Sequence, residues 1–436
     1  MSHDLTRTIE SSIAAKVKWR VLPLLMAAWL VAYIDRFNVS FAALQMNSAI
    51  GLSTTMFGFG AGLFFIGYAL FEVPSNVALA RFGARKWLAR IMITWGLVTV
   101  GQMWVSGPTS FYALRFLLGV AEAGCFPGMA FYLSRWLPPR ERAAALAGLG
   151  SMAMLSGIVG APLAAALLAL DGVYGLAGWQ WLFLVEGVPA VLIGLLVLRY
   201  LPDAPESASW LTQEERLWLA TNVTSSVEVE RRTLQNLQLI MRDPRYWAWG
   251  AAFFCTAAAG SASTLLRPIL IRQMAGLDNI TTAALSAVPA IVGVVAMVYI
   301  GRHSTQVDER RWHSAVPALI SAVGLILSGW VHGLMGVLMV AAIATVGGAF
   351  QPPLFGMVSS VASGSRNAVG IAFVNSIAAV GGFAGPYLLG YLVDRTGGFV
   401  VSHGIAGLLM IAGACLVLLV KDRRPASAPR DSVVGV

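Results

Sequence analysis

The chain alternates long apolar stretches with short polar ones. About twelve stretches are each long enough to cross the hydrocarbon core of a bilayer as a helix, which takes roughly 20 residues. The first six cover residues 21–44, 57–79, 87–105, 111–134, 143–170 and 179–201. The last six cover residues 246–274, 282–301, 313–331, 334–355, 366–392 and 399–420. This pattern predicts an all-α polytopic membrane protein.

One long hydrophilic segment, residues 202–245, divides the apolar stretches into two sets of six. The fifth stretch contains GIVGAP and the eleventh contains the similar GFAGP, so the second set echoes the first. We therefore predict two pseudo-symmetric six-helix halves, 21–201 and 246–420, joined by a linker at 202–245 and flanked by tails at 1–20 and 421–436. Paired halves that rock about a central site are typical of transporters.

Composition and charge support a membrane protein and orient it. Hydrophobic residues make up 57% of the 436 residues and charged residues only 12%, whereas soluble domains carry about 25% charged residues. The net charge is +9, and the basic residues lie in short loops between the apolar stretches. Positive loops face the cytoplasm, so we expect both tails and the linker there. This distribution argues against a nucleic-acid-binding patch.

Several chemistries find no support in the sequence. The three cysteines, Cys125, Cys255 and Cys415, stand singly in apolar stretches, which disfavours a disulfide framework or a zinc site. There is no GxxxxGK[ST] phosphate-binding loop and no nucleophile and base in a recognisable catalytic motif. We therefore expect neither an enzyme nor a bound metal or cofactor, and a secondary transporter is favoured over an ATP-driven pump.

Ionisable side chains inside a span each cost at least about 2.5–3.5 kcal/mol to insert at mid-bilayer, and seven of them are candidates for a function. Formally their charge is −1 when every acid is ionised and +1 when two acids are protonated, so the set can exchange protons for an anion. The bases are Arg36, Arg115 and Arg267, and the acids are Asp35, Glu72, Glu122 and Glu186.

Two pairs among these residues stand out by their spacing. Arg115 and Glu122 are seven residues apart, which places them on nearly the same helix face about 10.5 Å apart along the axis. Asp35 and Arg36 are adjacent and about 100° apart, so we expect them to have different partners. A guanidinium matches a carboxylate, and a buried carboxyl group takes up a proton readily. The pairs suit an organic anion moving with a proton. Alternatively, they form interhelical ion pairs that only hold the fold together.

Other polar groups within the spans are assigned by their position. Glu72 lies near the cytoplasmic end of its span, where a structural or gating role facing loop arginines is expected. Arg267 either extends toward the outer interface or binds a second substrate carboxylate. Glu186 has no predicted partner. Tyr33 and Tyr68 are candidates for direct contact with a ligand.

Taken together, several stretches resemble the major facilitator superfamily and, within it, the anion:cation symporter family of bacterial tartrate, phthalate, hydroxyphenylacetate and sugar-acid carriers. The resemblance covers nearly the whole chain. It rests on AYIDRFNVSFAAL, GAGLFFIGYALFEVPSN, RFGARKWLARIMITWG, FYALRFLLGVAEAGCFPG, GWQWLFLVEGVPA, ERRWH and NSIAAVGGFAGPYLLGYLVD.

The resemblance implies roles for individual residues. It makes Asp35 and Glu122 the proton-coupling acids. It makes Arg36 and Arg115 the arginines that engage the substrate carboxylate. Further residues that it places around the central cavity are Tyr33, Tyr68, Asn375 and the aromatic Phe355.

The sequence departs from the superfamily pattern at the cytoplasmic loop between the second and third spans. An aspartate normally precedes the arginine of this loop, but this chain has Ala80 before Arg81. We assign gating to Glu72, Arg81 and Arg85, with a latch that differs from that of relatives.

These observations predict a proton-coupled symporter that imports a small organic carboxylate, such as a tartrate-like dicarboxylate, an aromatic acid or a sugar acid, by alternating access. We expect it in the bacterial inner membrane as a functional monomer, with the bilayer as its partner and the proton as its coupling ion. An exporter of organic anions or drugs is the main alternative, followed by a nontransporting sensor or a channel.

Overall fold

The computed structural model describes residues 3–137, 139–222, 229–362 and 364–420, and these form helices without any strand. Within them, ten helical segments are long and apolar enough to cross a membrane. Two further helices, α4 (Ala84–Gly101) and α14 (Arg311–Ser328), run beside these ten and complete twelve crossings. The predicted all-α architecture is confirmed.

The amino-terminal half is built from helices whose bounds follow the predicted spans closely. They are α1 (His3–Arg20), α2 (Leu22–Ala49), α3 (Thr54–Phe82), α4, η1 (Gln102–Trp104), α5 (Pro108–Glu122), α6 (Cys125–Ser134), α7 (Pro139–Leu168), η2 (Val173–Gly175) and α8 (Gly178–Tyr200).

The carboxy-terminal half repeats this plan after a short helical connection. The connection contains η3 (Pro205–Ser207), α9 (Gln213–Asn222) and α10 (Val229–Arg242). The helices of the second half are α11 (Pro244–Ala275), α12 (Asn279–Leu285), α13 (Ala287–Gln306), α14, α15 (Leu334–Thr345), η4 (Val346–Phe350), α16 (Gln351–Val361), α17 (Gly364–Thr396) and α18 (Phe399–Leu419).

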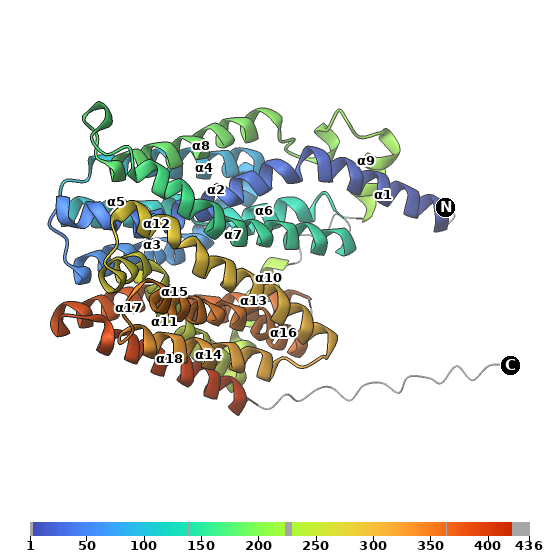
Figure 1. Cartoon of the computed structure of the whole chain (residues 1–436). Coiled ribbons are helices and arrows are strands. Elements are labelled where there is room, and N and C mark those ends of the chain that lie inside the picture. Colours follow the sequence, from blue (N-terminus) through green and yellow to red (C-terminus); the bar gives the residue numbers. More distant parts are fainter. Residues whose placement is uncertain (1–2, 138, 223–228, 363, 421–436) are drawn as a thin grey trace.

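Figure 1 shows the two halves as neighbouring bundles, blue to green for α2–α8 and yellow to red for α11–α18. The start of α1 and the end of α18 lie at the same end of the molecule. Both segments predicted as polar contain helices: α1 covers most of residues 1–20, and α9 and α10 lie in the connection. The Lys16 ammonium contacts the Glu215 carboxylate at 2.7 Å and so ties α1 to α9. The predicted tail at 421–436 lies outside the described residues.

Some predicted spans are interrupted rather than continuous. The fourth span divides into α5 and α6 at Ala123 and Gly124, directly after Glu122. Gly124 has φ +82°, which glycine adopts without the strain that a Cβ would bring. The Ser75 hydroxyl of α3 donates to the Ala123 carbonyl at 2.6 Å and satisfies one backbone group that the break exposes. Sequence periodicity alone does not reveal such a break.

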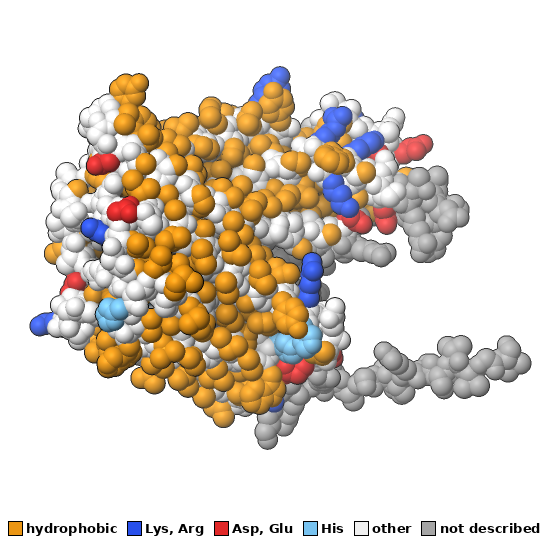
Figure 2. Space-filling view, viewed as in Figure 1, with side chains coloured by type: hydrophobic (Ala, Val, Ile, Leu, Met, Phe, Trp, Pro, Cys, Tyr) orange, Lys and Arg blue, Asp and Glu red, His pale blue; other side chains and the backbone are white. Residues whose placement is uncertain are grey.

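The end of the molecule opposite α1 is closed by contacts between the halves. Asp394, near the end of α17, accepts hydrogen bonds from the backbone N–H groups of Thr54 and Thr55 at 3.1 and 2.7 Å. Arg272 donates to the Leu44 carbonyl at 2.9 Å. At the other end, Figure 2 shows the surface hollowed between the two halves. The described structure is therefore closed at one end and open at the other.

Candidate functional site

Asp35 lies in the middle of α2, fully buried, with both carboxyl oxygens hydrogen-bonded. The Asn38 amide, one turn further along α2, donates to Oδ1 at 2.8 Å. The Thr99 hydroxyl of α4 donates to Oδ2 at 2.8 Å. Asp35 is thus held between two helices by neutral donors and has no direct salt bridge among the described residues.

Arg36 points to a different partner, as the spacing predicted. Its guanidinium forms an ion pair with Glu122, the last residue of α5, and the two side chains are 14% and 1% exposed. The guanidinium carbon also lies 5.0, 5.1 and 5.3 Å from the ring centres of Tyr33, Phe64 and Tyr68. These aromatic faces stabilise a cation that is largely out of water.

Arg115 lies about two turns before Glu122 on α5 and is 1% exposed. Its guanidinium carbon is 5.4 Å from the Phe64 ring centre. In the described structure its Nε and Nη1 atoms are buried without any hydrogen-bond partner. Since buried donors are normally paired, Arg115 has free capacity for an acceptor such as a carboxylate.

The structure therefore brings together six of the predicted site residues in the amino-terminal half: Tyr33, Asp35, Arg36, Tyr68, Arg115 and Glu122. Sequence reasoning missed Phe64 and Thr99 as members of this cluster. Phe64 sits four residues before Tyr68 on α3, a spacing that could have indicated a shared face. Thr99 lies on another helix, and the sequence contains no comparable signal for it.

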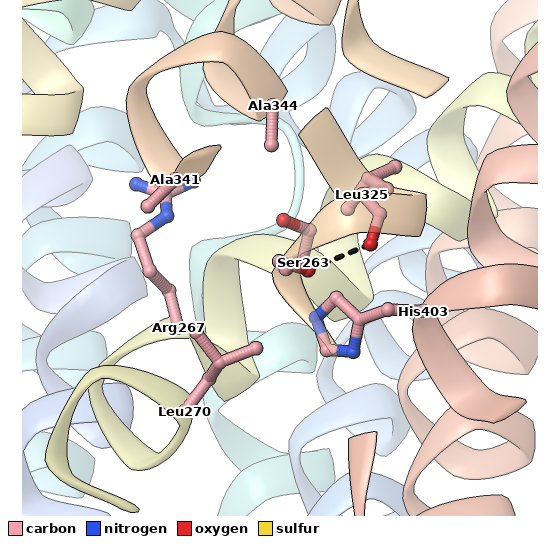
Figure 3. Close-up of a pocket in the computed structure, with 8 residues that line it drawn as sticks. Ser263, Arg267, Leu270, Leu325, Ala341, Ala344 and His403 are labelled. Carbon is pink, nitrogen blue, oxygen red and sulfur yellow. Dashed lines mark hydrogen bonds between the residues drawn. The ribbon is translucent and has the colours of Figure 1, made fainter. Parts of the chain in front are cut away.

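Arg267 on α11 belongs to a small pocket within the carboxy-terminal half (Figure 3). Its Nη2 donates to the Thr264 hydroxyl at 3.3 Å, and its Nε is buried without a partner. His403 on α18 lines the same pocket, and its Nδ1 also has no partner among the described residues. The remaining lining residues are Ser263, Leu270, Leu325, Ser328, Ala341 and Ala344.

The other two predicted residues of this half lie apart from the amino-terminal cluster. Asn375 is exposed on α17. Phe355 on α16 packs edge-to-face on Phe253 at 5.6 Å between ring centres. Within the described residues neither side chain directly contacts the cluster, so their place at a common site remains a prediction.

The predicted gating residues lie around the end of α3 and the start of α4. Glu72 is half-buried, and no salt bridge is found for it within the described ranges. Arg81 is exposed, with its guanidinium carbon 5.6 Å from the Phe82 ring centre. Arg85 donates to the Leu198 carbonyl of α8 at 2.8 Å and to Asp203 at the start of the connection at 3.4 Å. A gating role for these residues stays a prediction.

Twelve apolar helices in two bundles, with a broken helix and buried charges, are typical of a multi-pass membrane transporter. The sequence model of the family "Major Facilitator Superfamily" matches residues 25–386, which is most of the chain. The chain belongs to this superfamily, whose members are transporters rather than enzymes.

Individual relatives extend the comparison. A protein of Agrobacterium vitis named "Putative tartrate transporter" is 42% identical over 98% of this chain and 96% of its own length. The "Quinolone resistance transporter" of Acinetobacter baumannii is 38% identical over 77% of this chain and 77% of its own length. A bacterial homologue of the human lysosomal transporter Spinster has the same fold, with a TM-score of 0.74 and 17% identity over 93% of this chain and 95% of that one.

Proposed function

We propose that the protein is a proton-coupled symporter that imports a small organic carboxylate, with tartrate-like dicarboxylates the leading class. The observation that carries this proposal is Arg115, a buried guanidinium with two unpartnered nitrogen atoms beside an ion-paired arginine. A substrate carboxylate would supply the missing acceptors. The similarity to the Agrobacterium vitis protein supports this substrate class.

Coupling to protons follows from the two acids of the cluster. Asp35 and Glu122 are both fully buried next to the arginines. Protonation of Glu122 would release Arg36 from its ion pair and free a second guanidinium for the substrate. Proton and anion would then each favour the binding of the other, which is the reciprocity that symport requires.

We place the second carboxylate of a dicarboxylate at Arg267. The four acids of residues 246–420 are Asp278, Asp308, Glu309 and Asp394, all at or near helix ends, so no acid lies mid-helix to compensate Arg267. A dicarboxylate carries two negative charges and Arg267 carries one uncompensated positive charge. Binding therefore leaves one negative charge in excess. One proton on Asp35 or Glu122 would restore neutrality, which a low-dielectric site favours.

The proposed cycle runs by alternating access in the bacterial inner membrane, with both termini and the linker in the cytoplasm. From the periplasmic side, protons load Asp35 and Glu122 and the anion binds Arg36 and Arg115. The halves then rock to the arrangement closed at the end opposite α1, which we take to be the periplasmic end, and both ligands leave to the cytoplasm. One chain contains both halves, so we expect a functional monomer without a cofactor.

A thermal-shift screen of the purified protein tests this proposal, because a ligand that prefers the folded state raises the melting temperature. The panel is tartrate, phthalate, hydroxybenzoates, hydroxyphenylacetate and sugar acids at two pH values, with Arg115→Ala as the matched variant. We expect at least one ligand to raise the melting temperature of the natural protein but not that of Arg115→Ala. A folded protein without any hit, or a hit that Arg115→Ala retains, would contradict carboxylate recognition at this site.

An exporter is the second candidate, because a relative at 38% identity is named a quinolone resistance transporter. Uptake into vesicles of defined orientation separates the two. Import driven by a proton gradient that is acid outside supports the symporter, whereas accumulation in inverted vesicles under the opposite gradient supports the exporter.

A further inference from the structure

Glu186 is a buried acid that the proposed cycle does not use. It lies mid-way along α8 and is 4% exposed. The next residue, Gly187, packs so closely on α4 that a Cβ there would lie 2.9 Å from the Gly96 carbonyl oxygen. Glu186 therefore sits in the tightly packed centre of the amino-terminal half, where water has little access.

The groups that face Glu186 come from α2. α8 packs against α2, and the Glu186 carboxyl group lies close to the Asn38 and Asp35 side chains of that helix. The other elements packed against α8 contain no charged residue near it: residues 91–101 of α4, η1, and residues 143–170 of α7. No cation therefore faces Glu186, unlike Glu122, which has Arg36.

Two oxygen atoms in this small group lack any hydrogen bond among the described residues. They are Oε2 of Glu186 and Oδ1 of Asn38, and both are buried. The Asn38 amide nitrogen already donates to Asp35 at 2.8 Å. An ionised Glu186 would thus leave two acceptors unsatisfied and a second negative charge beside Asp35, both costly in an apolar interior.

We propose that Glu186 is held in its protonated form and acts as a positioning residue for the proton-coupling acid Asp35. With the proton on Oε2, the carboxyl donates to Asn38 Oδ1 and satisfies both unpartnered atoms at once. This bond fixes the rotation of the amide, so that Nδ2 is directed at Asp35 Oδ1. Glu186 thereby keeps the Asn38 amide as a donor to the Asp35 carboxylate. Glu186 itself does not contact the substrate.

Infrared difference spectroscopy tests the protonation directly and does not depend on transport. The full-length protein in lipid is compared with Glu186→Gln at neutral pH, in the region where protonated carboxyl groups absorb. We expect the variant to lose one protonated-carboxyl band. The matched control, Glu215→Gln, removes a buried glutamate that is paired with Lys16, and it should lose no such band. An unchanged protonated-carboxyl region in Glu186→Gln would overturn the proposal.

The pH profile of proton-driven uptake tests the positioning role and rests on the proposed symport. Glu186→Met keeps the side-chain length but removes the donor to Asn38, so Asp35 loses a fixed hydrogen bond and protonates at higher pH. We expect the profile to move toward higher pH by about 0.5–1 unit, the equivalent of one hydrogen bond.

Glu186→Gln can still donate to Asn38 and should keep the profile of the natural protein. A profile unchanged in Glu186→Met, or shifted equally in both variants, would contradict the positioning role. If Glu186→Met fails to fold, the infrared comparison with Glu186→Gln still decides the protonation. Failure of symport itself would appear in the natural protein as pH-independent uptake, which distinguishes the two proposals.

Discussion

The interiors of the two halves differ in the charges they hold. The amino-terminal half holds Asp35, Arg36, Arg115 and Glu122, whose formal charges cancel, together with Glu186, which we propose is protonated. In the carboxy-terminal half, the described interior holds Arg267, with no acid beside it. Because the halves repeat one helical plan, their difference lies in side chains rather than in architecture.

This contrast separates two tasks. A neutral set containing both acids and bases can gain or lose a proton at modest cost, which suits coupling. An isolated cation gains most from a permanent anion, which suits substrate selection. Under the proposed function, the difference therefore assigns proton coupling to the amino-terminal half, and choice of ligand is shared by the carboxy-terminal half.

Neutralisation of Asp35 should have the largest effect on this division. Asp35→Asn keeps the size of the side chain but removes the ionisable group, so proton-driven accumulation should be lost entirely. Exchange of labelled for unlabelled substrate, which needs no net proton movement, should continue. Uptake and counterflow in proteoliposomes measure the two. Normal accumulation by Asp35→Asn would move coupling away from this residue.

Removal of Arg267 should give the next largest effect and should depend on the ligand. A hydrogen bond to a charged group contributes about 1.5–3 kcal/mol, so Arg267→Ala should weaken dicarboxylate binding roughly 10- to 150-fold. Monocarboxylates should bind nearly as before. Titration of both ligand classes by calorimetry measures this, with the exposed Arg395→Ala as control. Equal losses for both classes would remove the assignment of a second carboxylate to Arg267.

Substitution of Gly124 tests how far the amino-terminal cluster depends on the break in the helix beside Glu122. Gly124→Ala places a Cβ at φ +82° and 2.5 Å from the Ser75 hydroxyl, so we expect a loss of about 1–3 kcal/mol in stability. Gly51→Ala is a matched control, since φ is +69° there but no atom lies within 4 Å of the new Cβ. The melting temperature of Gly124→Ala should lie well below that of Gly51→Ala. Equal melting temperatures would show that packing against Ser75 is unimportant.

The smallest effect should come from a charge outside the membrane. Burial raises the pKa of the Glu215 carboxyl, but hydrogen bonds from Lys16, the Thr212 backbone and Ser12 outweigh it and hold the pKa below its usual value. The stabilisation is therefore present above about pH 4.3 and is lost as pH falls through the lower folded-state value.

Glu215→Gln should consequently reduce stability by about 0.5–1 kcal/mol at neutral pH and by less in acid. Melting temperatures of the variant and the natural protein across this pH range measure the difference. A difference that stays constant down to acid pH would show that ionisation of Glu215 contributes nothing.

Much of the fold could be predicted from the sequence because the bilayer imposes a strong length and hydropathy constraint on each span. The separate partners of Asp35 and Arg36 also followed from helix geometry alone. The shared face of Arg115 and Glu122 is a local property of α5, so a single segment was sufficient to predict it.

The remaining features depend on contacts between distant segments. Thr99 reaches Asp35 from another helix, and Ser75 supports the break at Ala123, so neither could be inferred from one segment. The place of Glu186 beside Asn38 required the packing of α8 on α2. Side-chain partners across helices are set by packing, which sequence periodicity does not encode.

The hydrogen bonds from Thr54 and Thr55 to Asp394 have a consequence for how the protein samples its states. If they favour the arrangement closed at that end by about 2 kcal/mol, roughly one molecule in thirty is open at that end at rest. The affinity measured from that side is then weakened by the same fraction, although the binding site is unaltered. A change at Asp394 would thus tune the substrate concentration at which transport from that side saturates.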